Sequence, residues 1–102
     1  MKPINTTAQT PRQAAAASAL ASLLTHYGMQ LPPVIAWHID ATGEVRGRLA
    51  VPPEGPVAAI RRVHRVLGGS VTSYEHDDGC RHLKATIPHL GQTITLWTPT
   101  AP

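Results

Sequence analysis

The feature that most constrains the fold is a pair of alternating segments joined by a three-residue turn. Successive side chains of a β-strand point to opposite faces, so apolar residues at every second position indicate a strand with one buried face. Both VIAWHID and EVRGRLAV show this pattern, with Ile35, Trp37 and Ile39 in the first and Val45, Gly47 and Leu49 in the second. The connection ATG, with Gly43 in the left-handed conformation, predicts a hairpin that opposes these residues in the pairs Ile39 with Val45, Trp37 with Gly47, and Ile35 with Leu49. All six then share one face, and the Trp37 ring covers the strand glycine.

Two helices are predicted to pack against that face. The first begins at TPRQ, where Thr10 caps the helix, Pro11 takes the first helical position and Gln13 completes a capping box. It runs to Gly28, and its apolar residues recur at the spacing of one helical face: Ala16, Leu20, Leu23, Leu24 and Tyr27. The second covers roughly residues 57–67 and ends at two glycines, with an apolar side opposite an arc of arginines.

Three further strands are predicted in SVTSYEH, CRHLKATI and QTITLWT, which DDG and PHLG separate. The sequence therefore predicts an α+β fold, a single antiparallel sheet of about five strands with the two helices packed on one face, in the order α-β-β-α-β-β-β. Residues 1–9 are expected to be a flexible N-terminal tail and residues 10–102 a single domain. This order resembles that of several unrelated small α+β proteins, among them secretion-chaperone-like and phage accessory proteins, and no motif is specific to one family.

Composition limits the core and the compartment. The 102 residues include no Phe and 4% aromatic residues, so the core must consist of Leu, Ile, Val and Ala with two Trp. Small domains with thin cores often depend on a partner, and we expect a homodimer. A single cysteine excludes an internal disulfide, and no apolar run suits a signal peptide or a membrane span, which favours a cytoplasmic protein without membrane contact. Seven Arg against two Lys indicate a bacterial or phage source.

The segment EHDDGCRH gathers two histidines, three carboxylates and the only cysteine. Asp78-Gly79 as a two-residue hairpin loop pairs His76 with Arg81 and Glu75 with His82, so the two histidines point to opposite faces. In this register four side chains share one face of the hairpin, and a metal site formed by them is the alternative: Glu75, Asp77, Cys80 and His82. Structural zinc sites usually take four ligands with paired Cys or His spacings that are missing here, so we predict a solvated polar tip and no metal.

Enzymatic chemistry is not predicted. A nucleophilic Cys80 would need an enclosed, electropositive setting that a hairpin tip does not offer. The sequence contains no G-x-S-x-G, phosphate-binding loop, H-E-x-x-H or dinucleotide-binding motif. We therefore expect neither a catalytic residue nor a small-molecule cofactor.

Two surfaces are candidates for binding. Strand parity sends six residues to the sheet face opposite the core: Arg46, Arg48, Lys84, Trp97, His38 and His82. Cations around an aromatic ring suit single-stranded nucleic acid, although a solvated face is the alternative. The second surface is the arc of Arg61, Arg62 and Arg65, which solubility alone would also explain.

These patterns predict a small non-enzymatic binding or adaptor module that contacts a macromolecule through its sheet face or edge. A protein partner or a second copy of the chain is the preferred partner. The alternative is a nucleic-acid-binding regulator that uses the Arg-rich sheet or helix surface, which the net charge of +3 permits without requiring it.

Overall fold

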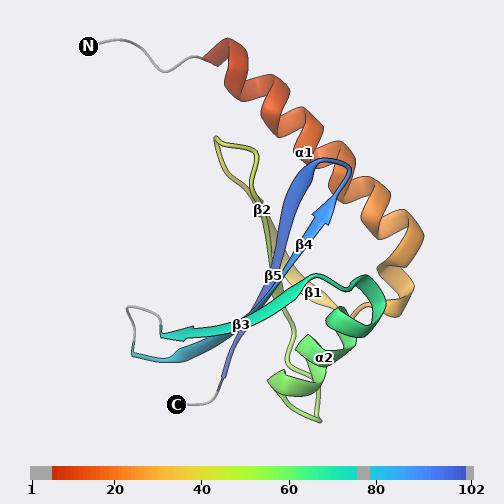
Figure 1. Ribbon diagram of the computed structural model, residues 1–102, viewed down its shortest axis with the longest axis vertical. Coiled ribbons are helices and arrows are strands. Elements are labelled where there is room, and N and C mark those ends of the chain that lie inside the picture. The colour runs from red at the N-terminus through yellow and green to blue at the C-terminus, as the bar shows by residue number, and fades with distance from the viewer. Residues whose placement is uncertain (1–5, 76–78, 101–102) are drawn as a thin grey trace.

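The computed structural model describes residues 6–75 and 79–100, which form a five-stranded sheet with two helices on one side (Figure 1). In chain order the elements are helix α1 (Thr6–Tyr27), the 3-10 helix η1 (Gly28–Gln30), strands β1 (Val34–Ile39) and β2 (Val45–Leu49), helix α2 (Pro56–Leu67), and strands β3 (Ser70–Glu75), β4 (Arg81–His89) and β5 (Gln92–Pro99). The predicted α+β class, with two helices and five strands, is confirmed. Among the described residues, neither helix combines the length and the apolar character that a membrane span requires.

The sheet is mixed, so the prediction of a purely antiparallel sheet is wrong. Its strand order is β1-β2-β5-β4-β3, and the pair β2 and β5 is parallel while the other three pairs are antiparallel. The chain leaves β2 through α2, crosses to the far edge at β3, and returns through β4 to place β5 beside β2 (Figure 1). Alternation in a sequence indicates which face a side chain takes but not which strand lies next to it, and this is why the error arose.

The β1–β2 hairpin keeps most of its predicted register. Trp37 pairs with Gly47 and Ile39 with Val45. A Cβ atom on Gly47 would lie 2.6 Å from Cζ3 of Trp37, so the indole covers this glycine as predicted. A bulge between Val34 and Ala36 breaks the alternation, however, and the side chain of Ile35 is 64% exposed. The expected place of Ile35 on the core face is therefore wrong, because a bulge shifts the parity of the residues before it.

Helix α1 starts earlier than predicted. It begins at Thr6, which places Pro11 inside the helix and leaves Thr10 without the capping position expected of it. Gln13 closes no capping box; its Nε2 atom donates instead to the carbonyl oxygen of Asp40 at 3.2 Å, which ties the helix to the β1–β2 turn. In that turn Gly43 has the left-handed φ of 86° that the hairpin prediction required.

The core lies between the helices and the inner face of the sheet. The largest of its fully buried side chains come from both layers: Leu23, Val63, Val45, Leu49, Ile94 and Leu96. Helix α2 matches its prediction to one residue and ends at Gly68, whose N–H donates to the carbonyl of His64 at 2.8 Å. Leu24 and Tyr27, which were expected on the buried stripe of α1, are partly exposed.

Candidate binding site on the open face of the sheet

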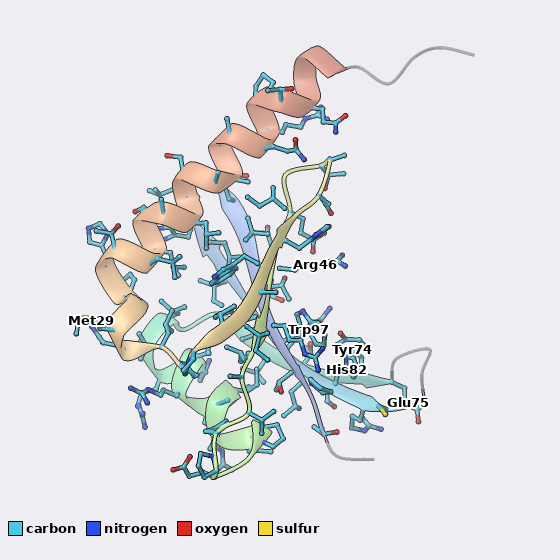
Figure 2. All side chains as sticks on the ribbon, turned by 180° about the vertical axis from the view of Figure 1, so that it is seen from behind. Met29, Arg46, Tyr74, Glu75, His82 and Trp97 are labelled. Carbon is cyan, nitrogen blue, oxygen red and sulfur yellow. The ribbon has the colours of Figure 1, made fainter. Side chains whose placement is uncertain are left out.

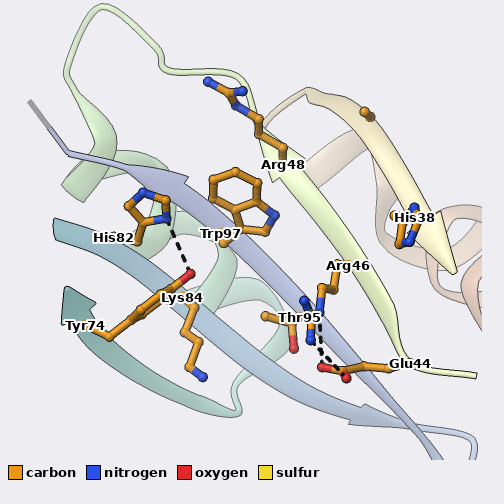
Figure 3. A pocket seen from close by; sticks show the side chains of 10 residues that line it. His38, Glu44, Arg46, Arg48, Tyr74, His82, Lys84, Thr95 and Trp97 are labelled. Atoms are coloured by element: carbon orange, nitrogen blue, oxygen red, sulfur yellow. Dashed lines mark hydrogen bonds and ion pairs between the residues drawn. The ribbon is translucent and has the colours of Figure 1, made fainter. Parts of the chain in front are cut away.

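The sheet face that the helices leave uncovered contains a cavity of about 520 Å³ (Figure 3). The residues that line it come from all five strands and the β1–β2 turn: Ala36, His38, Glu44, Arg46, Arg48, Tyr74, His82, Lys84, Thr95 and Trp97. All six residues that strand parity assigned to this face are among them. The geometry thus brings together side chains that are distant in the sequence.

Pairing between neighbouring strands explains why these side chains meet. Residues opposite each other in adjacent strands point to the same face and lie about 5 Å apart. Arg48 pairs with Trp97 across the parallel β2–β5 contact, and Trp97 pairs with Lys84 across the antiparallel β5–β4 contact. His38 and Arg46 form a further pair near the other end of β1 and β2. A row of polar and aromatic side chains therefore crosses the middle of the sheet.

Three aromatic rings form the floor of the cavity next to β3. The His82 ring stacks on Trp97 with the ring centroids 5.2 Å apart and the planes within 3° of parallel. The Tyr74 ring meets His82 edge-on at 5.4 Å, and the Tyr74 hydroxyl lies 3.4 Å from Nδ1 of His82. His82 is only 4% exposed, so the expectation that it is solvated is wrong. The two neighbouring rings cover it, and it in turn holds the Trp97 ring in place.

Cations lie beside these rings. The guanidinium carbon of Arg48 is 5.4 Å from the centre of the Trp97 ring, and Nζ of Lys84 is 5.2 Å from the centre of the Tyr74 ring. Arg46 differs, because its Nη2 atom lies 3.3 Å from Oε2 of Glu44. The hydrogen bond and the charge of Glu44 raise the pKa of Arg46. Both members of this ion pair are exposed to solvent, so the pair contributes little to stability and leaves Arg46 available to an anion.

Tyr74 is the site residue that sequence reasoning missed. The predicted two-residue loop paired Glu75 with His82, whereas in the structure Tyr74 pairs with His82 and Glu75 with Arg81. A shift of one residue moves every side chain of a strand to the opposite face. Tyr74 therefore joins the open face and Glu75 leaves it. The signal that could have identified Tyr74 was the aromatic pair it makes opposite His82, since such cross-strand pairs help to fix a register.

The tip of the β3–β4 hairpin is described only in part. His76, Asp77 and Asp78 lie outside the described residues. The predicted pairing of Arg81 with His76 is wrong, because Arg81 pairs with Glu75. Within residues 6–75 and 79–100, no three His, Cys, Asp or Glu side chains gather as a metal site would require. Cys80 is partly buried.

The second predicted surface, the arc of Arg61, Arg62 and Arg65, borders a separate hollow of about 470 Å³. The three arginines are exposed on α2, and the hollow continues over Pro32, Pro33 and Pro52. Among the described residues that line it, none is aromatic. Nε of Arg62 donates to the carbonyl oxygen of Gln30 at 2.7 Å, so this arginine also ties α2 to η1.

Comparison with models of protein families, with curated proteins and with solved structures finds no match to this chain. The function of this chain is therefore inferred from the geometry of the open face.

Proposed function

We propose that this chain is a non-enzymatic binding module that contacts an anionic macromolecule through the open face of its sheet. The observation that carries the proposal is the convergence of Arg46, Arg48 and Lys84 with three aromatic rings in one cavity. Among the described residues that line this cavity, Glu44 is the one with a carboxylate, so the formal charge of the lining is positive. A positively charged face around large rings offers both attraction for an anion and apolar contact area.

The burial of His82 argues against a catalytic role for this residue. A general acid or base must come within hydrogen-bonding reach of the proton that it transfers. Two histidines line this cavity: His38 is exposed, whereas the Tyr74 and Trp97 rings cover His82. A substrate would have to displace one of those rings to reach it. The arrangement favours His82 as a support for the rings.

The test compares two triple variants that remove the same charge from different surfaces. The sheet variant combines Arg46→Gln, Arg48→Gln and Lys84→Gln, and the helix variant combines Arg61→Gln, Arg62→Gln and Arg65→Gln. The probes are a single-stranded oligothymidylate of eight nucleotides and an octaglutamate peptide, both fluorescently labelled. We expect the sheet variant to weaken binding of the better probe by about 100-fold, because charge-assisted contacts to the anion are lost. The helix variant should weaken it by less than about 3-fold.

Thermal melting of both variants controls for folding, and exposed charges contribute little to it. The proposal fails if neither probe binds near physiological salt. It also fails if the helix variant loses as much affinity as the sheet variant, because the functional surface would then be α2.

The edges of the sheet offer a second candidate function, self-association into a homodimer. Strands β1 and β3 form the two edges, and each exposes an apolar side chain, Ile35 on β1 and Val71 on β3. Edge strands of this kind can pair with a second copy of the chain. A light-scattering mass of two chains at micromolar concentration would support the homodimer, and a mass of one chain would contradict it.

A further inference from the structure

Cations and rings alternate across the open face. In the order of the strands, β2 contributes Arg48, β5 contributes Trp97, β4 contributes Lys84 and β3 contributes Tyr74. Arg48, Trp97 and Lys84 lie opposite one another in adjacent strands, which are about 4.8 Å apart. Tyr74 lies opposite His82, two residues along β3 from Thr72, the partner of Lys84. From β2 to β3 the row therefore runs cation, ring, cation, ring, and its last member is displaced along β3. Each nucleotide of a single strand likewise presents one phosphate and one base. The row therefore has the composition and the order that two successive nucleotides would require.

The contacts within the row can be exchanged for contacts with a nucleotide. In the structure the Arg48 guanidinium lies over Trp97 and the Lys84 ammonium over Tyr74. A cation over an exposed ring is worth roughly 2- to 5-fold in an equilibrium constant, whereas a base stacked on such a ring is worth roughly 5- to 150-fold. A base can therefore replace the cation at the ring. The displaced side chain is long and flexible, so it can move to the adjacent phosphate.

The rings are held in position before any ligand arrives. His82 stacks almost parallel to Trp97 and is buried beneath Tyr74, which restricts the rotation of both rings. Pre-organised rings lose little conformational entropy when a base stacks on them. The cavity volume of about 520 Å³ lies within the range of roughly 300–1,000 Å³ that is common for small-ligand sites, which is room for a short stretch of a strand.

We infer that the anionic partner is single-stranded nucleic acid, with its bases on Trp97 and Tyr74 and its phosphates on Arg48 and Lys84. This inference rests on the proposed function and adds the chemical class of the partner. An acidic peptide would use the two cations and make no stacking contact with the rings. A duplex presents its phosphates but keeps the faces of its bases within its own stack, so it would also leave the rings unused.

The test measures anisotropy of three labelled probes: the eight-nucleotide oligothymidylate, the same strand in a duplex with oligoadenylate, and octaglutamate. The wild-type protein should bind the single strand at least about 10-fold more tightly than either of the others. Trp97→Leu and Tyr74→Leu should each weaken binding of the single strand by about 10-fold or more. They should change the affinity for octaglutamate by less than about 2-fold, because both cations remain.

Two control variants separate stacking from folding. Tyr27→Leu removes a partly exposed tyrosine of α1, away from the sheet face, and should leave all three affinities unchanged. Trp97→Phe keeps an aromatic face and should retain most of the affinity for the single strand. If Trp97→Leu does not fold, Tyr74→Leu on the edge strand β3 still decides the question.

Equal affinity for the single strand and octaglutamate, or for the single strand and the duplex, would overturn the inference. So would ring variants that weaken octaglutamate as much as the single strand. If octaglutamate binds tightly and the sheet triple variant abolishes that binding, the open face remains the binding surface and only the nucleic-acid partner is wrong.

Discussion

Two surfaces of this protein each present three cationic side chains, but they are built differently. On α2, Arg61, Arg62 and Arg65 come from two turns of one helix, and the hollow they border is also lined by prolines, aliphatic side chains and Glu54. On the open sheet face the cations come from β2 and β4 and lie among aromatic rings from β3, β4 and β5 (Figure 3). Figure 2 shows the three rings, those of Tyr74, His82 and Trp97, close together on this face. Two surfaces with the same number of cationic side chains therefore differ as binding sites. On the sheet face, strands that are distant in the sequence place aromatic rings beside the cations, and the described residues that line the α2 hollow include no such ring.

The largest difference in the free energy of unfolding is expected between two variants that each replace a histidine, one on each surface. His82→Ala should lower the free energy of unfolding by about 1–3 kcal/mol, because it removes a buried ring and its two aromatic contacts. His64→Ala, on the exposed face of α2, should change it by less than about 0.5 kcal/mol. Urea denaturation of both variants measures the two values. Similar losses would mean that the rings of the sheet face do not depend on His82.

A smaller effect would show that the helix surface is partly structural. Arg62→Gln removes the hydrogen bond from Nε to the carbonyl of Gln30 and should lower the free energy of unfolding by about 0.5–1 kcal/mol. Arg61→Gln serves as the matched control, because it removes an exposed arginine one residue earlier, and should cost less. Denaturation curves that coincide for the two variants would show that the contact with Gln30 adds nothing to stability.

The smallest effect concerns the turn that carries Glu44 beside Arg46. Asp40 accepts hydrogen bonds from the Thr42 hydroxyl and from the backbone N–H groups of Thr42 and Glu44, and these lower its pKa below the usual 3.8. A carboxyl whose pKa is lower in the folded state stabilises the fold above its unfolded pKa, and this contribution is lost as the pH falls through the folded pKa.

Melting temperatures of the wild-type protein and Asp40→Asn check this between pH 7 and pH 2. The advantage of the wild type should be constant above about pH 5 and should shrink below the usual carboxyl pKa. An advantage that grows as the pH falls would contradict the assignment. The effect is confined to one exposed turn, so it should leave the rings of the sheet face unaffected.

Local patterns predicted the faces of the strands but not their neighbours. The alternation around Arg46, Arg48 and Lys84 placed these cations correctly on the open face, because parity depends only on adjacent residues. The burial of His82 could not be predicted in this way, because it depends on Trp97 from β5 and on the register that brings Tyr74 opposite. Whether any of these residues binds a ligand stays a prediction.

The errors in the predicted fold also arise because local patterns do not determine tertiary contacts. The bulge before Ala36, which exposes Ile35, and the parallel contact between β2 and β5 are both set by tertiary packing. Neither has a local signature that distinguishes it from a regular antiparallel sheet. The early start of α1 at Thr6 shows the converse, because a strong local capping signal at Thr10 was overridden.

The parallel contact between β2 and β5 also bears on how the chain reaches this structure. The β1–β2 hairpin and the β3–β4–β5 meander each involve neighbouring segments, whereas Val45 meets Ile94 only after about half of the chain has been closed into a loop. Contacts of such long sequence separation slow folding. Arg48 belongs to the hairpin, while Trp97, Lys84 and Tyr74 belong to the meander. The complete row of cations and rings therefore exists only after the two parts have joined, and it depends on the pairing of β2 with β5.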